Sequence, residues 1–305
     1  MTITQNRNPS TDGKHHKKEV ISSWEVTEYQ EKGFIVVDNI FNQEEIELMN
    51  SAISELIAGA QGLEESNLIY DLGAGHEPKK PQIRRIKDPF LHHEIFSKMA
   101  RNPRLISCLN SLLGPNIRLH GSKINLKPAH DGSSVEWHQD WAFYPHTNDN
   151  VLAVGVMLDD MTPENGPLLM MPGSHKGPTH DHHQDGRFVG AINHSAVDIP
   201  FERAEALFGK CGACSFHHAR TIHGSATNKS DKNRCLLLFQ IAAADAWDLT
   251  GPEKLDWEAY LSTILSGSPS IEPRLELVPI RLPYPPAERQ GSIYENQSLL
   301  KNKFF

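Results

Sequence analysis

The sequence predicts a mainly β protein with flanking α-helices, in which an antiparallel sandwich or barrel forms the core. From Ile117 onward the chain consists of short apolar or alternating runs, separated by Gly, Pro, Asn and Asp, and no helical pattern lies between them. Before that position the apolar residues recur at helical spacing. The helices are therefore expected to precede a sheet core rather than to alternate with its strands.

The beginning of the chain is expected to be a disordered tail, because residues 1–22 are polar, lysine-rich and without periodicity. Order is expected to begin near Trp24. The first predicted strand is the β-branched run GFIVV at residues 33–37.

Two helices are predicted in the first third of the chain from their start signals. Asn42 followed by Glu45 has the form of a capping box, and apolar residues at helical spacing come directly after it. Asn102 and Pro103 open the second helix, which Gly114 can end.

The core strands are predicted from six runs, at residues 117–128, 133–143, 150–158, 166–175, 212–224 and 233–243. The final segment, from about residue 267 to residue 305, is rich in proline and is expected to be an extended wrap or lid. Since no repeat or second core is visible, the prediction is a single domain over residues 23–305 that includes this extension.

Composition narrows the possible partners of the chain. The 305 residues carry a formal net charge of −8, whereas non-specific binding of nucleic acid or an anionic membrane needs a surplus of Lys and Arg. No apolar run approaches the roughly 20 residues that span a bilayer, and the start of the chain lacks the apolar segment of a secretory signal. We therefore expect a cytoplasmic protein that binds neither nucleic acid nor membranes.

The four cysteines agree with a reducing compartment. Cys211 and Cys214 form a single CxxC pair, which is a weak signal for a redox or zinc site because no second pair completes it. A turn between strands is the expected structure there. The histidines within residues 180–183 are expected to be solvated loop residues.

The run VEWHQDWAF, at residues 135–143, contains the candidate chemistry. On a strand, His138 and Asp140 would project from the same face. His223, which precedes the final glycine of the run ARTIHG, is a candidate third ligand. Two histidines and one carboxylate are typical of non-haem Fe(II) oxygenases. An HxD pair also occurs by chance, so a metal-free binding protein remains open on these residues alone.

Arg234 adds a second signal at the head of the run RCLLLFQIAA. Alternation places it on one face of an apolar strand, and a buried guanidinium needs an anion, for which a carboxylate is the best geometric match. If residues 219–223 and 234–242 pair as a hairpin, Arg234 lies deeper in the same barrel than His223. It could then hold the far carboxylate of a 2-oxo diacid that chelates a metal.

Together these motifs resemble the phytanoyl-CoA dioxygenase family of Fe(II)/2-oxoglutarate-dependent oxygenases. The resemblance extends from about Gly33 to Trp247, and is carried by GFIVV, GPNI, WHQD, ENGPLLMMPGSHKG, IHGSATN and Arg234. It implies a double-stranded β-helix, or jelly roll, with N-terminal helices. The implied iron ligands are His138, Asp140 and His223, and the implied 2-oxoglutarate contacts are Arg234, Ser225 and Gln139.

Three further positions bear on the cosubstrate and the substrate. Arg85 takes the place of a cosubstrate-contacting lysine of the enzyme that names the family, and Lys123 stands where that enzyme has a methionine. With Val156 in place of a tryptophan, these departures favour a small anionic or polar substrate over an acyl-CoA, although Lys123 could instead reach 2-oxoglutarate. Lys127 is a substrate candidate whose stronger interpretation is a solvated loop lysine.

Three aromatic residues follow the ligand motif, namely Trp141, Phe143 and Tyr144. They are candidates for the mouth of the cavity, and ordinary core packing is the alternative.

The resemblance implies an enzyme that hydroxylates a small-molecule metabolite with O₂, while 2-oxoglutarate is decarboxylated to succinate and CO₂. Asp140 favours hydroxylation over halogenation, because related halogenases have a small residue at that position. The main alternative is a catalytically silent jelly-roll protein that binds a small molecule. A zinc hydrolase is less favoured, since no HExxH motif is present. The sequence indicates no oligomeric state.

Overall fold

Two antiparallel sheets form the core of the computed structural model, which describes residues 20–73, 75–130, 133–287 and 292–305. The predicted tail lies outside the described residues up to residue 19. At its end Ile21 is buried and Ser22 caps the first helix. These two residues, which the sequence assigned to the tail, therefore belong to the packed structure.

The larger sheet has eight strands. Along it lie β1 (Phe34–Val37), β11 (Cys214–His218), β6 (Val151–Met157), β13 (Arg234–Ala243), β4 (Ile117–Lys127), β3 (Ile83–Lys87) and β2 (Tyr70–Leu72), and β14 (Ile264–Ser266) also pairs with β4. Its apolar outer face packs on the helices of the first third. Val156 belongs to this face, where it is fully buried in the main hydrophobic cluster and so points away from the metal candidates.

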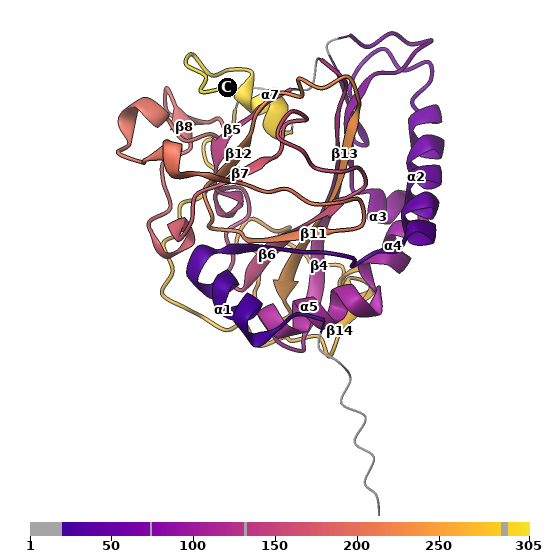
Figure 1. The fold of residues 1–305 in the computed structure, drawn as a ribbon. Helices are drawn as coiled ribbons and strands as arrows, with labels where there is room; N and C mark the ends of the chain where they lie inside the picture. The colour runs from indigo at the N-terminus through magenta and orange to yellow at the C-terminus, as the bar shows by residue number, and fades with distance from the viewer. Residues whose placement is uncertain (1–19, 74, 131–132, 288–291) are drawn as a thin grey trace, which may run out of the picture.

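The smaller sheet has four strands, in the order β10 (Glu205–Ala206), β7 (Leu168–Met170), β12 (His223–Ser225) and β5 (Val135–His138). A separate two-stranded ribbon joins β8 (His183–Gln184) and β9 (Arg187–Phe188). The two main sheets make the jelly roll, so the fold class predicted from the sequence is confirmed (Figure 1).

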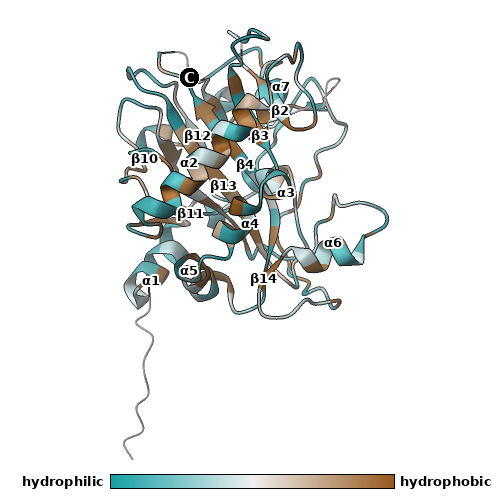
Figure 2. Cartoon of the chain, turned by 90° about the vertical axis from the view of Figure 1, so that its right-hand side faces the viewer, coloured by the Kyte–Doolittle hydropathy of each residue, from teal (hydrophilic) through white to brown (hydrophobic). Residues whose placement is uncertain are grey.

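The described residues form seven α-helices, of which two were predicted from the sequence. In order the seven are α1 (Ser23–Lys32), α2 (Gln43–Ala58), α3 (Pro89–His92), α4 (Glu94–Ala100), α5 (Pro103–Leu113), α6 (Trp257–Ser262) and α7 (Ile293–Gln297). Asn42 and Glu45 form the expected capping box, and Asn102 caps α5. Figure 2 shows α2 and α4 in front of the strands of the larger sheet. No described helix is both long and apolar enough to cross a membrane.

Two predictions about the strands were wrong. The strand in VEWHQDWAF ends at His138, and Asp140 opens a short 3₁₀ helix over Asp140–Ala142. The hairpin between residues 219–223 and 234–242 does not form. A turn, in which Thr221 N–H donates to the carbonyl of His218, carries the chain from the larger sheet into the smaller one. Consequently β12 pairs with β5 and β7, whereas β13 lies between β4 and β6.

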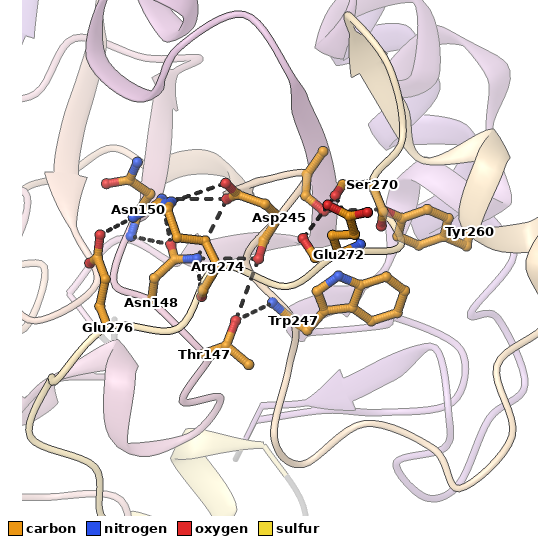
Figure 3. A network of polar contacts seen from close by, with 11 residues as sticks. Thr147, Asn148, Asn150, Asp245, Trp247, Tyr260, Ser270, Glu272, Arg274 and Glu276 are labelled. Carbon is orange, nitrogen blue, oxygen red and sulfur yellow. Dashed lines mark hydrogen bonds and ion pairs between the residues drawn. The ribbon is translucent and has the colours of Figure 1, made fainter.

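Residues 267–287 of the C-terminal segment are largely extended, and the segment also contains the unpredicted helix α7. Figure 3 shows how a polar network fastens this segment to the end of β13. Arg274 Nε lies 3.0 Å from Asp245 Oδ2, and Arg274 Nη2 lies 2.9 Å from Asn148 Oδ1. The wrap is therefore anchored to the core by a charged side chain.

Candidate metal centre

His138, Asp140 and His223 converge in the interior between the two sheets. His138 and His223 are cross-strand partners at the end of β5 and the start of β12, and their ring centroids lie 4.0 Å apart. One ligand atom from each of the three residues lies within 4.8 Å of the others, and all three are buried. Within the described ranges this is the one group of three or more such side chains with metal-site spacing.

Both histidines are oriented by backbone carbonyls. His138 Nδ1 lies 2.8 Å from the carbonyl oxygen of Glu136, and His223 Nδ1 lies 2.9 Å from that of Thr221. Because a carbonyl oxygen only accepts, each Nδ1 carries the hydrogen and each Nε2 keeps a lone pair for a ligand bond. Burial lowers the pKa of His223 to about 4 and that of His138 well below its usual value. Both imidazoles are therefore neutral near pH 7.

Asp140 supplies the anionic member of the cluster. Its Oδ2 is buried and has no hydrogen-bond partner among the described residues. Burial by itself would raise the pKa of Asp140, but the nearby cation Lys123, with Nζ 3.9 Å from Oδ1, holds it well below its usual value. A buried ionised carboxylate without a hydrogen bond beside two imidazole lone pairs fits a divalent cation.

His217 was missed by the sequence-based prediction. It lies on β11, fully buried, with Nε2 3.6 Å from Asp140 Oδ2, and neither of its ring nitrogens has a hydrogen-bond partner among the described residues. The alternation of CSFHH, which turns Ser215 and His217 inward, is the signal that could have identified it. His217 therefore sits behind the carboxylate of the cluster.

A row of polar side chains runs from the cluster along β4. Lys123, Asn125 and Lys127 alternate on its inward face and line one cavity with the three metal candidates. β13 lies beside this row in register, with Arg234 opposite Lys127. Leu236 and Leu238 of β13 give the cavity an apolar surface next to Arg234. In the run RCLLLFQIAA, the face that the sequence placed inward, with Arg234, does line the cavity.

The far end of this cavity holds two buried cations. Arg234 Nη2 donates to the carbonyl of Gly166, and Lys127 Nζ donates to Ser225 Oγ at 2.9 Å and to the carbonyl of Ala226. Neither cation has an acidic partner among the described residues that line the cavity. Burial, and then the charge of Arg234, lower the pKa of Lys127 well below its usual value. The prediction of Lys127 as a solvated loop lysine was wrong, because β4 extends to it.

Arg85 lies on β3, where its Nε donates to Asn125 Oδ1 at 2.9 Å. Together with Lys123 it stands between the inner cavity and an outer one of about 240 Å³. Phe143 and Tyr144 line this outer cavity, in keeping with their predicted position.

The structure places two predicted site residues elsewhere. Gln139 points away from the cavity, and its amide donates to the carbonyls of Pro178 and Arg220. Gln139 therefore does not take the predicted role in cosubstrate binding, and it connects backbone segments instead. Trp141 is fully buried among apolar residues, and its Nε1 donates to the carbonyl of Pro279 at 2.8 Å. It is a core residue because the 3₁₀ turn after His138 changes the alternation of the strand.

Outside the site, the turn at CGAC is confirmed: Cys211 lies in a turn and Cys214 begins β11. One of the histidines in residues 180–183 is not solvated, contrary to the prediction. His182 is buried, and its Nε2 accepts a hydrogen bond from the backbone N–H of Gln139 at 2.9 Å. It supports the backbone next to the cluster.

Comparison with known proteins agrees with this geometry. Residues 29–235 match the model of the phytanoyl-CoA dioxygenase (PhyH) family. The chain is 37% identical over 282 residues to a probable alpha-ketoglutarate-dependent hypophosphite dioxygenase of Stutzerimonas stutzeri, covering 91% of this chain and 98% of that protein. It is 27% identical over 229 residues to the ectoine dioxygenase of Sphingopyxis alaskensis, covering 68% and 71%. The fold is similar to that of EctD from S. alaskensis with bound Fe, with a TM-score of 0.64, 24% identity and coverage of 85% and 89%.

The jelly roll and its buried His-Asp-His cluster define an oxygenase of the Fe(II)/2-oxoglutarate class. The chain belongs to the phytanoyl-CoA dioxygenase family. The family, the enzyme class and the reactants Fe(II), 2-oxoglutarate and O₂ that the sequence motifs implied are confirmed.

Proposed function

We propose that this dioxygenase hydroxylates a small anionic substrate within one domain over residues 23–305. The observation that carries the proposal is the charge of the cavity. Four basic side chains line it, those of Arg85, Lys123, Lys127 and Arg234, whereas Asp140 is the one acidic side chain among the described lining residues. One bound 2-oxoglutarate, whose proximal end chelates the metal, does not need all four of these positive side chains.

The iron would be held by Nε2 of His138, Nε2 of His223 and the carboxylate of Asp140. When bound with 2-oxoglutarate, iron supplies the O₂ activation that yields succinate, CO₂ and an oxidant for the substrate. The part of the protein is to keep both imidazoles neutral, to keep the carboxylate ionised and to exclude bulk water.

Arg234 and Lys127 are suited to the distal carboxylate of 2-oxoglutarate. The guanidinium offers the bidentate geometry that a carboxylate prefers, and Ser225 Oγ lies beside the ammonium group. Leu236 and Leu238 supply apolar contact for the methylene groups between the two ends of the cosubstrate. This assignment leaves Arg85 and Lys123 without a cosubstrate carboxylate.

Arg85 and Lys123 are therefore assigned to the substrate. Lys123 Nζ lies 3.9 Å from Asp140 Oδ1, which places a cation directly beside the metal cluster. A substrate anion held there would have its reacting bond next to the iron. An outer cavity of about 240 Å³ suits a small oxyanion or acid and is too small for an acyl-CoA. The relative of S. stutzeri, named for hypophosphite, supports an oxyanion as the first compound to test.

The test is succinate release under O₂ with Fe(II) and 2-oxoglutarate, with hypophosphite, L-proline and ectoine added in turn. We expect hypophosphite to stimulate release several-fold, and Lys123→Met to remove the stimulation while basal release continues. Stimulation by ectoine or L-proline and not by hypophosphite would contradict the assignment of an anionic substrate.

The catalytically silent binding protein considered from the sequence finds no support in the comparisons, whose named relatives are alpha-ketoglutarate-dependent dioxygenases. We also propose a cytoplasmic location, which the four unpaired cysteines support.

A further inference from the structure

The C-terminal helix α7 covers one end of the active-site cavity. Ile293 and Tyr294 from this helix line the same cavity as the metal cluster and Arg234. The helix packs beside β5, the strand that carries His138 (Figure 1). It lies more than fifty residues beyond the region that matches the family model, which ends at residue 235.

Specific hydrogen bonds determine the position of α7. At its start, the carboxylate of Glu295 accepts a hydrogen bond from the backbone N–H of Ser292 at 2.9 Å. Gln297 joins it to two neighbours: its Nε2 donates to the carbonyl of Gly190 at 2.9 Å, and its Oε1 accepts from the backbone N–H of Glu136 at 2.9 Å. The carboxylate of Glu136 accepts from the N–H of Phe304 at 2.7 Å. The helix is therefore part of the barrel wall.

Tyr294 is the polar residue that α7 brings to the cavity. Its side chain is 5% exposed, and its hydroxyl is buried without a hydrogen-bond partner among the described residues. The ring lies over two guanidinium groups, with its centroid 4.6 Å from Arg84 Cζ and 4.9 Å from Arg85 Cζ. These contacts hold the ring in place, but they leave the hydroxyl unsatisfied, which is unfavourable for a buried donor.

Tyr294 lines the same cavity as Arg234 and Lys127. All three side chains are buried, and the phenol hydroxyl has no hydrogen-bond partner among the described residues. A carboxylate bound by Arg234 would therefore share this cavity with the unpaired phenol.

We propose that Tyr294 donates its hydroxyl hydrogen to the distal carboxylate of 2-oxoglutarate, so that the C-terminal helix completes the cosubstrate site. The inference rests on the proposed function. A neutral donor beside Arg234 and Lys127 would add a directed hydrogen bond, since a phenol presents a single hydrogen along one line. It would also couple the order of α7 to the presence of cosubstrate.

The test is an anaerobic titration of the Fe(II)-loaded full chain, in which the visible charge-transfer band of a 2-oxo acid on iron is followed. We expect Tyr294→Phe to raise the Kd for 2-oxoglutarate about tenfold, as for the loss of one hydrogen bond to a charged group. The same titration with 2-oxopentanoate, which has the same chain length without the distal carboxylate, should give equal Kd values for wild type and variant. Tyr70→Phe, whose hydroxyl bonds to the carbonyl of Leu56, is the matched control and should change neither.

Three outcomes would overturn the inference. The first is an unchanged Kd for 2-oxoglutarate in Tyr294→Phe. The second is an equal loss of affinity for both 2-oxo acids, which would assign Tyr294 to packing alone. The third is the absence of a band in the wild-type protein with either acid. This last result would refute the proposed function itself, and so it differs from the other two.

Discussion

At the scale of single residues, the site depends on side chains whose buried polar atoms lack partners. Asp140 Oδ2 and the hydroxyl of Tyr294 are buried without a hydrogen bond among the described residues. Arg234 and Lys127 are cross-strand partners, and neither is paired with an acidic side chain among the described residues that line the cavity. Isolated buried charges are costly, so their presence in one cavity is explained by ligands that complete them.

The role of Arg234 can be tested by a change that keeps its charge. Arg234→Lys retains a cation but loses the two parallel hydrogen bonds to a carboxylate, so we expect the Kd for 2-oxoglutarate to rise about tenfold. Isothermal titration calorimetry of the iron-loaded protein under anaerobic conditions would measure it. Arg104→Lys, on the exposed side of α5, is the control. Equal affinity in Arg234→Lys and wild type would show that another cation holds the carboxylate.

Trp141 tests the distinction between core and cavity mouth. Its ring is fully buried and its Nε1 donates to Pro279, so Trp141→Phe should lower the free energy of unfolding by about 1–3 kcal/mol. The KM for the substrate should stay unchanged. Urea unfolding and steady-state kinetics on the same preparation check both expectations. A severalfold change of KM with an unchanged free energy of unfolding would instead indicate that Trp141 lines the mouth of the cavity.

At the scale of elements, local sequence signals predicted where helices and strands form, but they did not predict which distant strands pair. The capping boxes and the alternating runs depend on neighbours in sequence, and Asn42, Asn102 and β13 appear as expected. The partner of β13 depends on the turn near Thr221, which moves the chain to the other sheet. Tyr294 could not be predicted, because its place at the cavity depends on how a proline-rich segment returns to β5.

The attachment of α7 can be tested without changing the cavity itself. Gln297→Ala removes the hydrogen bonds to Gly190 and Glu136, so amide hydrogen exchange in residues 292–305 should become faster while the core strands keep their protection. Gln43→Ala, on the exposed face of α2, is the control. Unchanged exchange in this segment would mean that apolar packing alone holds α7.

At the scale of the whole molecule, charge is unevenly distributed. The chain carries a formal net charge of −8, yet its central cavity holds four basic side chains and a single acidic one among the described lining residues. An acidic surface around a cationic cavity argues for a small anion as ligand and against an extended polyanion. Both the metal cluster and Arg234 were predicted from motifs, whereas the depth of Lys127 emerged only from the register of β4 with β13.

Buried histidines make the stability of the whole molecule sensitive to acid. Burial lowers the pKa of His120 and of His146 to about 3 and that of His182 to about 4, from an ordinary value of 6.5. As the pH falls below 6.5, these histidines become protonated in the unfolded chain before they do in the folded protein. The free energy of unfolding therefore decreases from pH 6.5 to about pH 3, and it is nearly constant just above pH 6.5.

Urea unfolding of the metal-free protein at several pH values measures this effect. The urea midpoint should fall steadily below pH 6.5, and His146→Asn should reduce the slope because its amide can donate to the same carbonyl of Tyr144 without titrating. A midpoint that rises on acidification would contradict the assignment of neutral buried histidines.

The most direct test of the central claim is an anaerobic titration of the metal-free protein with Fe(II) and then 2-oxoglutarate, carried out on wild type, Asp140→Ala and the surface control Asp160→Ala. The wild type and the control should bind one iron per chain and develop a visible charge-transfer band on addition of 2-oxoglutarate. Asp140→Ala should lose more than the roughly 10–100-fold in metal affinity that follows loss of an outer-shell partner, and should show no band. A band of full intensity in Asp140→Ala, or none in the wild type, would contradict an iron site built from His138, Asp140 and His223.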